Sequence, residues 1–216
     1  MSNISNGEIF VIGVGIFCTI ILLLVLYRYT FDKSYNKTTK YYVVTRHPNR
    51  YEAANILHNL NIFSMKLLDK MYTKYQNNPK AMEFVNNLIN KYDPDYLEEN
   101  DPTFTVGHKT FTLNFQRISI CLRKKNGEFY DMNTLQFVMM HELSHIAALE
   151  KNHDDRFWMV FKFILRSAEE LVGYVPVQYE QYPFVYCGIT VSHNPYFSEY
   201  DLTPFTINTA RHDSNN

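Results

Sequence analysis

The sequence predicts an α+β fold, in which an apolar N-terminal helix precedes one domain made of helices and a small β-sheet. Three observations lead to this prediction. Residues 9–27 are uncharged and apolar, residues 49–75 place apolar side chains at helical spacing, and residues 104–122 are rich in β-branched and aromatic residues. With 216 residues, 46% of them hydrophobic, the chain is long enough for one domain with a sizeable core.

The N-terminal apolar run has a length that suits one crossing of a bilayer. No lysine or arginine precedes residues 9–27, whereas four basic residues follow within residues 28–40. A cleaved signal peptide would instead have a positive start and a small-residue cleavage site. We therefore expect a short tail at residues 1–8, a transmembrane anchor at 9–27 and a single-pass membrane protein whose C-terminal domain lies on the cytoplasmic side.

The segment after the anchor predicts a linker, a strand and two helices. Residues 28–40 are polar and suit a linker, and residues 41–45 (YYVVT) suit a short strand. Residues 49–75 carry apolar side chains at helical spacing. Asn78 is a good N-cap and Pro79 suits a first helical turn, so a second helix is expected to begin there.

The middle of the chain predicts a small sheet. Residues 104–106, 110–115 and 118–122 combine β-branched and aromatic side chains, and residues 118–122 are the clearest strand. Residues 125–128 (KNGE) are a turn signal.

The next predicted helix carries an HExxH motif, His141-Glu142-Leu143-Ser144-His145. Residues four apart lie on one face of a helix, so both imidazoles can point at one metal ion while Glu142 lies beside them. A charged surface helix can carry this motif by chance. This helix is mostly apolar, however, and buried polar groups need partners, which a metal supplies. We expect the helix to cover about residues 134–150.

Polar residues mark the ends of this helix and the one after it. Asp131 or Asn133 is expected to cap the motif helix, and Asp154 or Asp155 the following one, which should end near Gly173. Asp154 and Asp155 could alternatively orient a histidine ligand. Beyond these helices, a last strand is expected within residues 186–191 and a loose tail at residues 201–216.

A hydrolytic zinc site needs three protein ligands and one open position. His153 follows the motif after a short turn, and we expect it to complete a zinc-binding set of His141, His145 and His153. Glu169 and Glu170 on the following helix are the alternatives for the third ligand. The other histidines lack partner spacing and are expected to be ordinary surface or structural residues: His47, His58, His108, His193 and His212.

Composition narrows the classes of function. The formal net charge of −1 gives no support for a general nucleic-acid-binding protein. Of three cysteines, Cys18 lies in the apolar N-terminal run, which leaves two for the domain. Because two are too few for a disulfide framework, we expect Cys121 and Cys187 to be reduced and mostly buried.

The motif region resembles a known family. HELSH, followed by a later histidine and then by DDRFW, resembles the WLM and SprT-like zinc metalloproteases, most closely over residues 135–165. The chain is also similar to predicted metalloproteases of large DNA viruses that pair such a domain with a membrane segment. The resemblance implies a zincin-like domain over residues 41–200, three histidine ligands for zinc, Glu142 as the catalytic base, and a viral or host internal membrane.

These observations together predict a membrane-anchored zinc metalloprotease that hydrolyses a protein or peptide substrate. Residues 118–122 are expected to line the cleft and pair with an extended substrate, and Tyr174, Tyr179 or Tyr182 to assist the oxyanion. Two alternatives are a non-catalytic membrane or virion protein with a structural or vestigial zinc site, and a SprT-type protease acting on DNA-associated proteins. The oligomeric state is left open.

Overall fold

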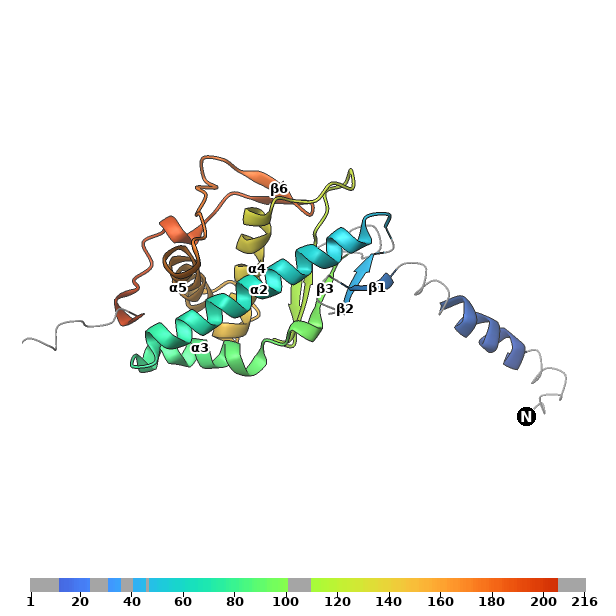
Figure 1. Ribbon diagram of the computed structural model, residues 1–216, viewed down its shortest axis with the longest axis horizontal. Helices are drawn as coiled ribbons and strands as arrows, with labels where there is room; N and C mark the ends of the chain where they lie inside the picture. The colour runs from blue at the N-terminus through green and yellow to red at the C-terminus, as the bar shows by residue number, and fades with distance from the viewer. Residues whose placement is uncertain (1–11, 24–30, 36–40, 46, 101–109, 206–216) are drawn as a thin grey trace, which may run out of the picture.

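The computed structural model describes residues 12–23, 31–35, 41–45, 47–100 and 110–205 (Figure 1). Helices and two small sheets make up the fold. In chain order the elements are β1 (Phe31–Tyr35), β2 (Tyr41–Thr45), α2 (Arg50–Tyr75), α3 (Pro79–Lys91), β3 (Leu97–Glu99), β4 (Phe111–Leu113), β5 (Arg117–Ile120), α4 (Met132–Ala148), α5 (Asp155–Val172), β6 (Phe184–Tyr186) and β7 (Ile189–Val191). Short 3-10 turns cover Pro94–Tyr96, Pro195–Phe197 and Thr203–Phe205.

The membrane-spanning helix expected at residues 9–27, and with it that part of the predicted fold class, is wrong. The helix described within this run covers residues 12–23. Of the helices in the described residues, none is both long and apolar enough to span a membrane. The predicted single-pass localisation is wrong for the same reason.

The main sheet is mixed, with strand order β1-β2-β3-β5-β4. The inner strands β2, β3 and β5 run parallel, while β1 and β4 are antiparallel strands at the two edges. β1 lies within the segment expected as a linker, and the expected strand at residues 104–106 falls outside the described residues. Because β5 is paired on both sides, the expectation that residues 118–122 pair with a substrate is wrong: the edge strand on that side is β4.

Local signals position the helices as the sequence predicts. The Asn78 side chain accepts hydrogen bonds from two backbone N–H groups at the start of α3. The Asp131 carboxylate accepts from the N–H of Thr134 and begins α4. Gly173 ends α5 in a left-handed conformation (φ 76°), which a residue without a Cβ adopts at little cost.

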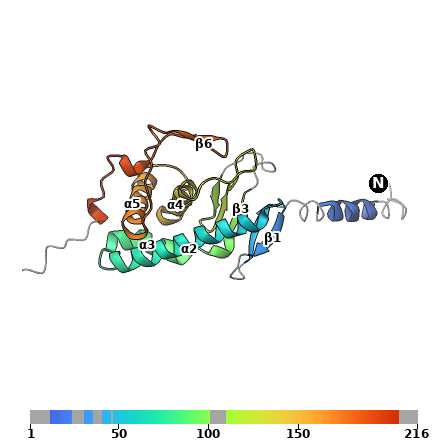
Figure 2. The ribbon, with the colours of Figure 1, turned by 45° about the horizontal axis from the view of Figure 1, so that its top comes forward.

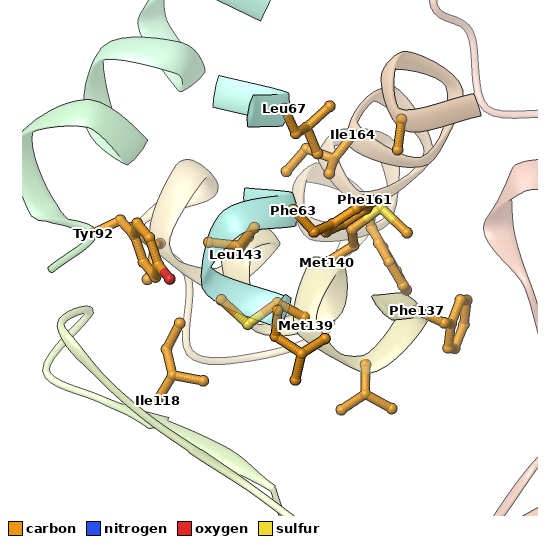
Figure 3. Close-up of a cluster of buried hydrophobic side chains, with 14 of the residues drawn as sticks. Phe63, Leu67, Tyr92, Ile118, Phe137, Met139, Met140, Leu143, Phe161 and Ile164 are labelled. Carbon is orange, nitrogen blue, oxygen red and sulfur yellow. The ribbon is translucent and has the colours of Figure 1, made fainter. Parts of the chain in front are cut away.

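Helix α4 is the centre of the fold. It contacts α2, α3 and α5 as well as strands β4 and β5, and Figure 2 shows α3 and α5 on one side of it and the main sheet on the other. Figure 3 shows the apolar packing around it, with side chains from α2 (Phe63, Leu67), α4 (Met139, Met140, Leu143), α5 (Phe161, Ile164) and β5 (Ile118). Phe205 is also buried and packs against Phe84 and Phe163.

A buried ion pair joins the inner strands. The Glu99 carboxylate accepts a hydrogen bond from Arg123 Nε (2.7 Å) and two more from the backbone N–H and hydroxyl of Thr45 (2.8 and 3.0 Å). Both charged side chains are almost fully buried, with 1% of Glu99 and 6% of Arg123 exposed. Removing either charge would leave the other unpaired in the interior.

The expectation of two reduced cysteines is wrong, because Cys121 and Cys187 form a disulfide across 66 residues of sequence. Cys121 directly follows β5, and Cys187 lies in the two-residue turn of the β6–β7 hairpin. Cys187 and Gly188 both have positive φ (47° and 82°), as the twist of a two-residue hairpin requires. The disulfide thereby attaches the hairpin to the main sheet.

Candidate metal centre

Helix α4 holds two histidines of the motif on one face, and the loop after it brings a third. Nitrogen atoms of His141, His145 and His153, one from each ring, all lie within 4.8 Å of one another. The Nε2 atoms of His141 and His153 are 3.1 Å apart. We call these residues the three-histidine cluster.

The turn between α4 and α5 places His153. Leu149 ends α4 with a left-handed backbone (φ 55°), a conformation more often taken by glycine at this position. The chain then reverses, and the Asp154 side chain accepts from the N–H of Phe157 to begin α5. Asp154 therefore serves as the N-cap, the structural one of its two expected roles. His153 is consequently held between two helix ends.

The rings of the cluster are oriented by their neighbours. His145 Nδ1 lies 2.7 Å from the carbonyl oxygen of Glu150, which can only accept, so Nδ1 carries the proton and Nε2 has a lone pair. Phe157 packs against all three rings, with centroid distances of 4.4, 4.6 and 5.0 Å. Trp158 contacts the His153 ring at 5.5 Å.

Loss of hydration, smallest at the more exposed His153, keeps the three rings in the form that binds metals. Burial lowers the pKa of each of them, and repulsion from His145 and His153 adds to the effect at His141, whose pKa lies well below its ordinary value. A lowered pKa means that the imidazole stays neutral at neutral pH. Neutral imidazole is the state that ligates a metal.

Glu142 lies beside the cluster and not in it. Its side chain is 2% exposed, and the Thr112 hydroxyl on β4 donates a hydrogen bond to one carboxylate oxygen at 2.6 Å. Burial raises the pKa of Glu142 to about 7, although the Thr112 hydrogen bond opposes the shift. A carboxyl group with a pKa near neutrality suits proton transfer at physiological pH.

Two pockets meet at the cluster. Both are lined by Thr110, His141, Glu142 and His153. The larger, of about 420 Å³, lies between α4, α5 and the β6–β7 hairpin. The smaller, of about 280 Å³, runs along β4 and past residues 113–115. A substrate crossing from one pocket to the other would pass the cluster and Glu142.

The alternative third ligands are engaged elsewhere. The Glu170 carboxylate pairs with Lys74, and Glu169 accepts a hydrogen bond from the Tyr196 hydroxyl. Neither belongs to the cluster found among the described residues.

None of the three tyrosines expected near the oxyanion lines either pocket. Tyr174 and Tyr179 are buried, and Tyr182 is 69% exposed.

Sequence reasoning missed two residues of the larger pocket, Tyr186 and His193. The Tyr186 hydroxyl donates to the carbonyl of Cys121 at 2.8 Å. His193 Nδ1 lies 2.9 Å from the Glu180 carboxylate, and its ring meets Trp158 edge-to-face. No spacing signal in the sequence points to either residue, because the hairpin and the segment after it bring them to α4.

The HExxH helix and the three-histidine cluster define the class of protein with which this chain is compared. The chain belongs to the WLM domain family, whose model matches residues 91–194, a range that includes the whole cluster, Glu142 and His193. The resemblance inferred from the motif is thereby confirmed.

The relatives are proteins of large DNA viruses. The chain is 33% identical over 165 residues to "Uncharacterized protein R325" of Acanthamoeba polyphaga mimivirus, covering 73% of this chain and 80% of that protein. It is 40% identical over 86 residues to "Uncharacterized protein 136R" of Invertebrate iridescent virus 6, and 34% identical over 93 residues to "Uncharacterized protein 042R" of Invertebrate iridescent virus 3. The chain spans about half the length of these two proteins (46% and 56%). No solved structure matches the chain.

Proposed function

We propose that this protein is a zinc-dependent metallopeptidase, in which His141, His145 and His153 hold the metal and Glu142 is the general base. The observation that carries the proposal is the convergence of three neutral imidazoles beside a buried glutamate, at the point where two pockets meet. Three histidine nitrogens are one of the ligand sets found in catalytic zinc sites. Membership of the WLM domain family supports a zinc metalloprotease-like role.

The residues of the site suit peptide hydrolysis. Zinc bound by the cluster would supply Lewis-acid polarisation of the scissile carbonyl and would activate a water. Glu142 takes the proton from the attacking water and delivers it to the leaving amine. Thr112 holds one oxygen of Glu142, which leaves the other to exchange the proton. His145 is fixed for ligation by the carbonyl of Glu150.

The substrate of this proposal is a protein or peptide in an extended conformation. β4 is an edge strand that lies along the smaller pocket, so a peptide can add to it through backbone hydrogen bonds. His193, whose ring is held by Glu180, lines the larger pocket and replaces the tyrosines as the candidate side chain for contacting the oxyanion.

Neither alternative function has a specific observation in its favour. A structural zinc site would gain support from a fourth protein ligand such as Cys187 or Glu170, but Cys187 is in a disulfide and Glu170 pairs with Lys74. A DNA-directed protease would be expected to carry a basic excess, whereas the formal net charge is −1. Salt-sensitive DNA binding by the full chain would revive that alternative.

The proposal is tested by Glu142→Gln in the zinc-loaded full chain. We expect zinc content to stay at the wild-type level while hydrolysis of a fluorogenic peptide library falls by roughly 10²- to 10⁴-fold, the usual contribution of a general base. Glu128→Gln, on an exposed turn, is the matched control and should cleave like wild type. A Glu142→Gln variant as active as wild type, or a zinc-loaded wild type that cleaves none of the peptides, would refute the proposal.

A further inference from the structure

The larger pocket beside the three-histidine cluster has apolar walls from three elements. These wall residues are Phe137 and Val138 of α4, Trp158 and Phe161 of α5, and Ile189 and Val191 of β7. His141, Glu142 and His153 line it as well. A group seated in the pocket therefore lies next to the atoms that would carry out hydrolysis.

The hairpin wall of this pocket is fixed in place before any ligand binds. The disulfide between Cys121 and Cys187 ties the hairpin turn to the end of β5. The Tyr186 hydroxyl donates to the Cys121 carbonyl, and the backbone N–H of Cys187 donates to the Tyr130 hydroxyl at 2.9 Å. A preformed wall lowers the entropic cost of binding. Even a modest apolar contact with it therefore contributes to the affinity for a ligand.

The lining chemistry selects against charged groups. The lining residues, all within the described chain, include no lysine or arginine, and their one carboxylate is that of Glu142. Against the apolar walls a charged side chain would lose hydration without gaining a counter-charge, because the charges of the site are confined to Glu142 and to a metal held by the cluster. A large aliphatic or aromatic side chain would instead remove apolar surface from water on both sides.

We propose that this pocket binds a bulky apolar side chain of the peptide substrate, next to the scissile bond. The proposal rests on the proposed metallopeptidase function and adds the substrate class: peptides with leucine, phenylalanine or a similar residue beside the cleaved bond. The rim residue Ile189 and the wall residue Trp158 are the specificity-determining contacts. Burial of one such side chain corresponds to roughly 10- to 100-fold in binding relative to a small or charged residue.

Trp158 lines the pocket and is the only tryptophan in the chain, so its fluorescence reports on binding there. Tryptophan fluorescence of the full chain, without metal and with zinc, would be titrated with N-acetyl-leucine amide and N-acetyl-phenylalanine amide. N-acetyl-aspartate amide and N-acetyl-lysine amide are the matched charged ligands. We expect a saturable change with the two apolar amides and binding at least roughly tenfold weaker with the charged ones.

Two residues of the same hairpin provide a matched pair of variants. Ile189 lines the pocket and is 40% exposed, whereas Val185 is 62% exposed and does not line it. Ile189→Asp should weaken apolar binding roughly tenfold or more, while Val185→Asp should bind like wild type. Ile189→Ala, which removes contact without adding a charge, should act in the same direction and guards against misfolding of the aspartate variant.

The proposal is overturned if no amide gives a saturable change, if the charged amides bind as well as the apolar ones, or if both Ile189 variants bind like wild type. This titration requires no hydrolysis, so its outcome is separable from that of the proposed function. If the apolar amides bind but the protein cleaves no peptide, the proposed metallopeptidase function is refuted while the apolar binding site stands. If peptides are cleaved at equal rates whatever side chain lies next to the scissile bond, the proposed role of the pocket in specificity is refuted while the metallopeptidase function stands.

Discussion

Removing His153 should weaken zinc binding without disturbing the helix that carries the other two ligands. His153 comes from the loop between α4 and α5, whereas His141 and His145 are both fixed on α4. Structural zinc sites bind with about 10–16 kcal/mol over four ligands, or roughly 3 kcal/mol per ligand. We therefore expect His153→Ala to lower zinc affinity by about 10²- to 10³-fold.

The assay is zinc competition against a chelator of known affinity, together with thermal unfolding of the full chain at fixed zinc. A ligand at 100 times its Kd stabilises the folded state by about 2.7 kcal/mol, and a 100-fold weaker site at the same concentration by about 0.4 kcal/mol. The zinc-dependent rise in Tm should thus nearly vanish in His153→Ala.

The control is His193→Ala, which removes another histidine of the larger pocket that lies outside the cluster. We expect this variant to bind zinc like wild type. The reasoning is refuted if His153→Ala keeps wild-type affinity, or if both variants lose zinc equally.

Three further changes test the surroundings of the site. Thr112→Val removes the hydrogen bond to Glu142 and should lower kcat by roughly 10- to 100-fold at unchanged zinc content, measured on the peptide library. Glu99→Gln leaves Arg123 without its charged partner and should cost about 3–5 kcal/mol of the free energy of unfolding in urea. Cys187→Ser removes the disulfide and should cost up to about 4 kcal/mol in the same measurement.

Each of these changes has a matched control. Thr112→Ser keeps a hydroxyl and should retain most of the activity; equal loss in both variants would show that Thr112 matters for packing alone. Glu98→Gln removes a carboxylate 3.9 Å from the exposed Arg117 and should cost less than about 1 kcal/mol. A reducing agent should destabilise wild type but not Cys187→Ser. Equal unfolding midpoints for both proteins, each with and without the reducing agent, would show that the disulfide does not stabilise the fold.

The helices and the motif could be predicted because their signals are local. The cap at Asn78 and Pro79, the caps at Asp131 and Asp154, and the stop at Gly173 each act within about one helical turn. The same four-residue period that makes a helix places His141 and His145 on one face. These features require no knowledge of how distant segments pack.

The errors concern length and long-range pairing. Hydropathy over residues 9–27 counts apolar side chains, but none of the helices in the described part of the chain is both long and apolar enough to span a membrane. Two cysteines 66 residues apart gave no local sign of pairing, and the strand at residues 118–122 gave none of being interior to its sheet.

By itself the sequence determined that this protein has an HExxH helix within a domain of helices and strands, and it narrowed the third ligand to a histidine or two glutamates. Only the tertiary structure shows which of them lies beside the motif, because the left-handed turn at Leu149 brings His153 to His141 and His145 while Lys74 and Tyr196 engage the glutamates. The same holds for Thr112 and His193. Their positions depend on which strand forms the sheet edge and where the hairpin is tied, and such non-local contacts are selected by the packing of the whole domain.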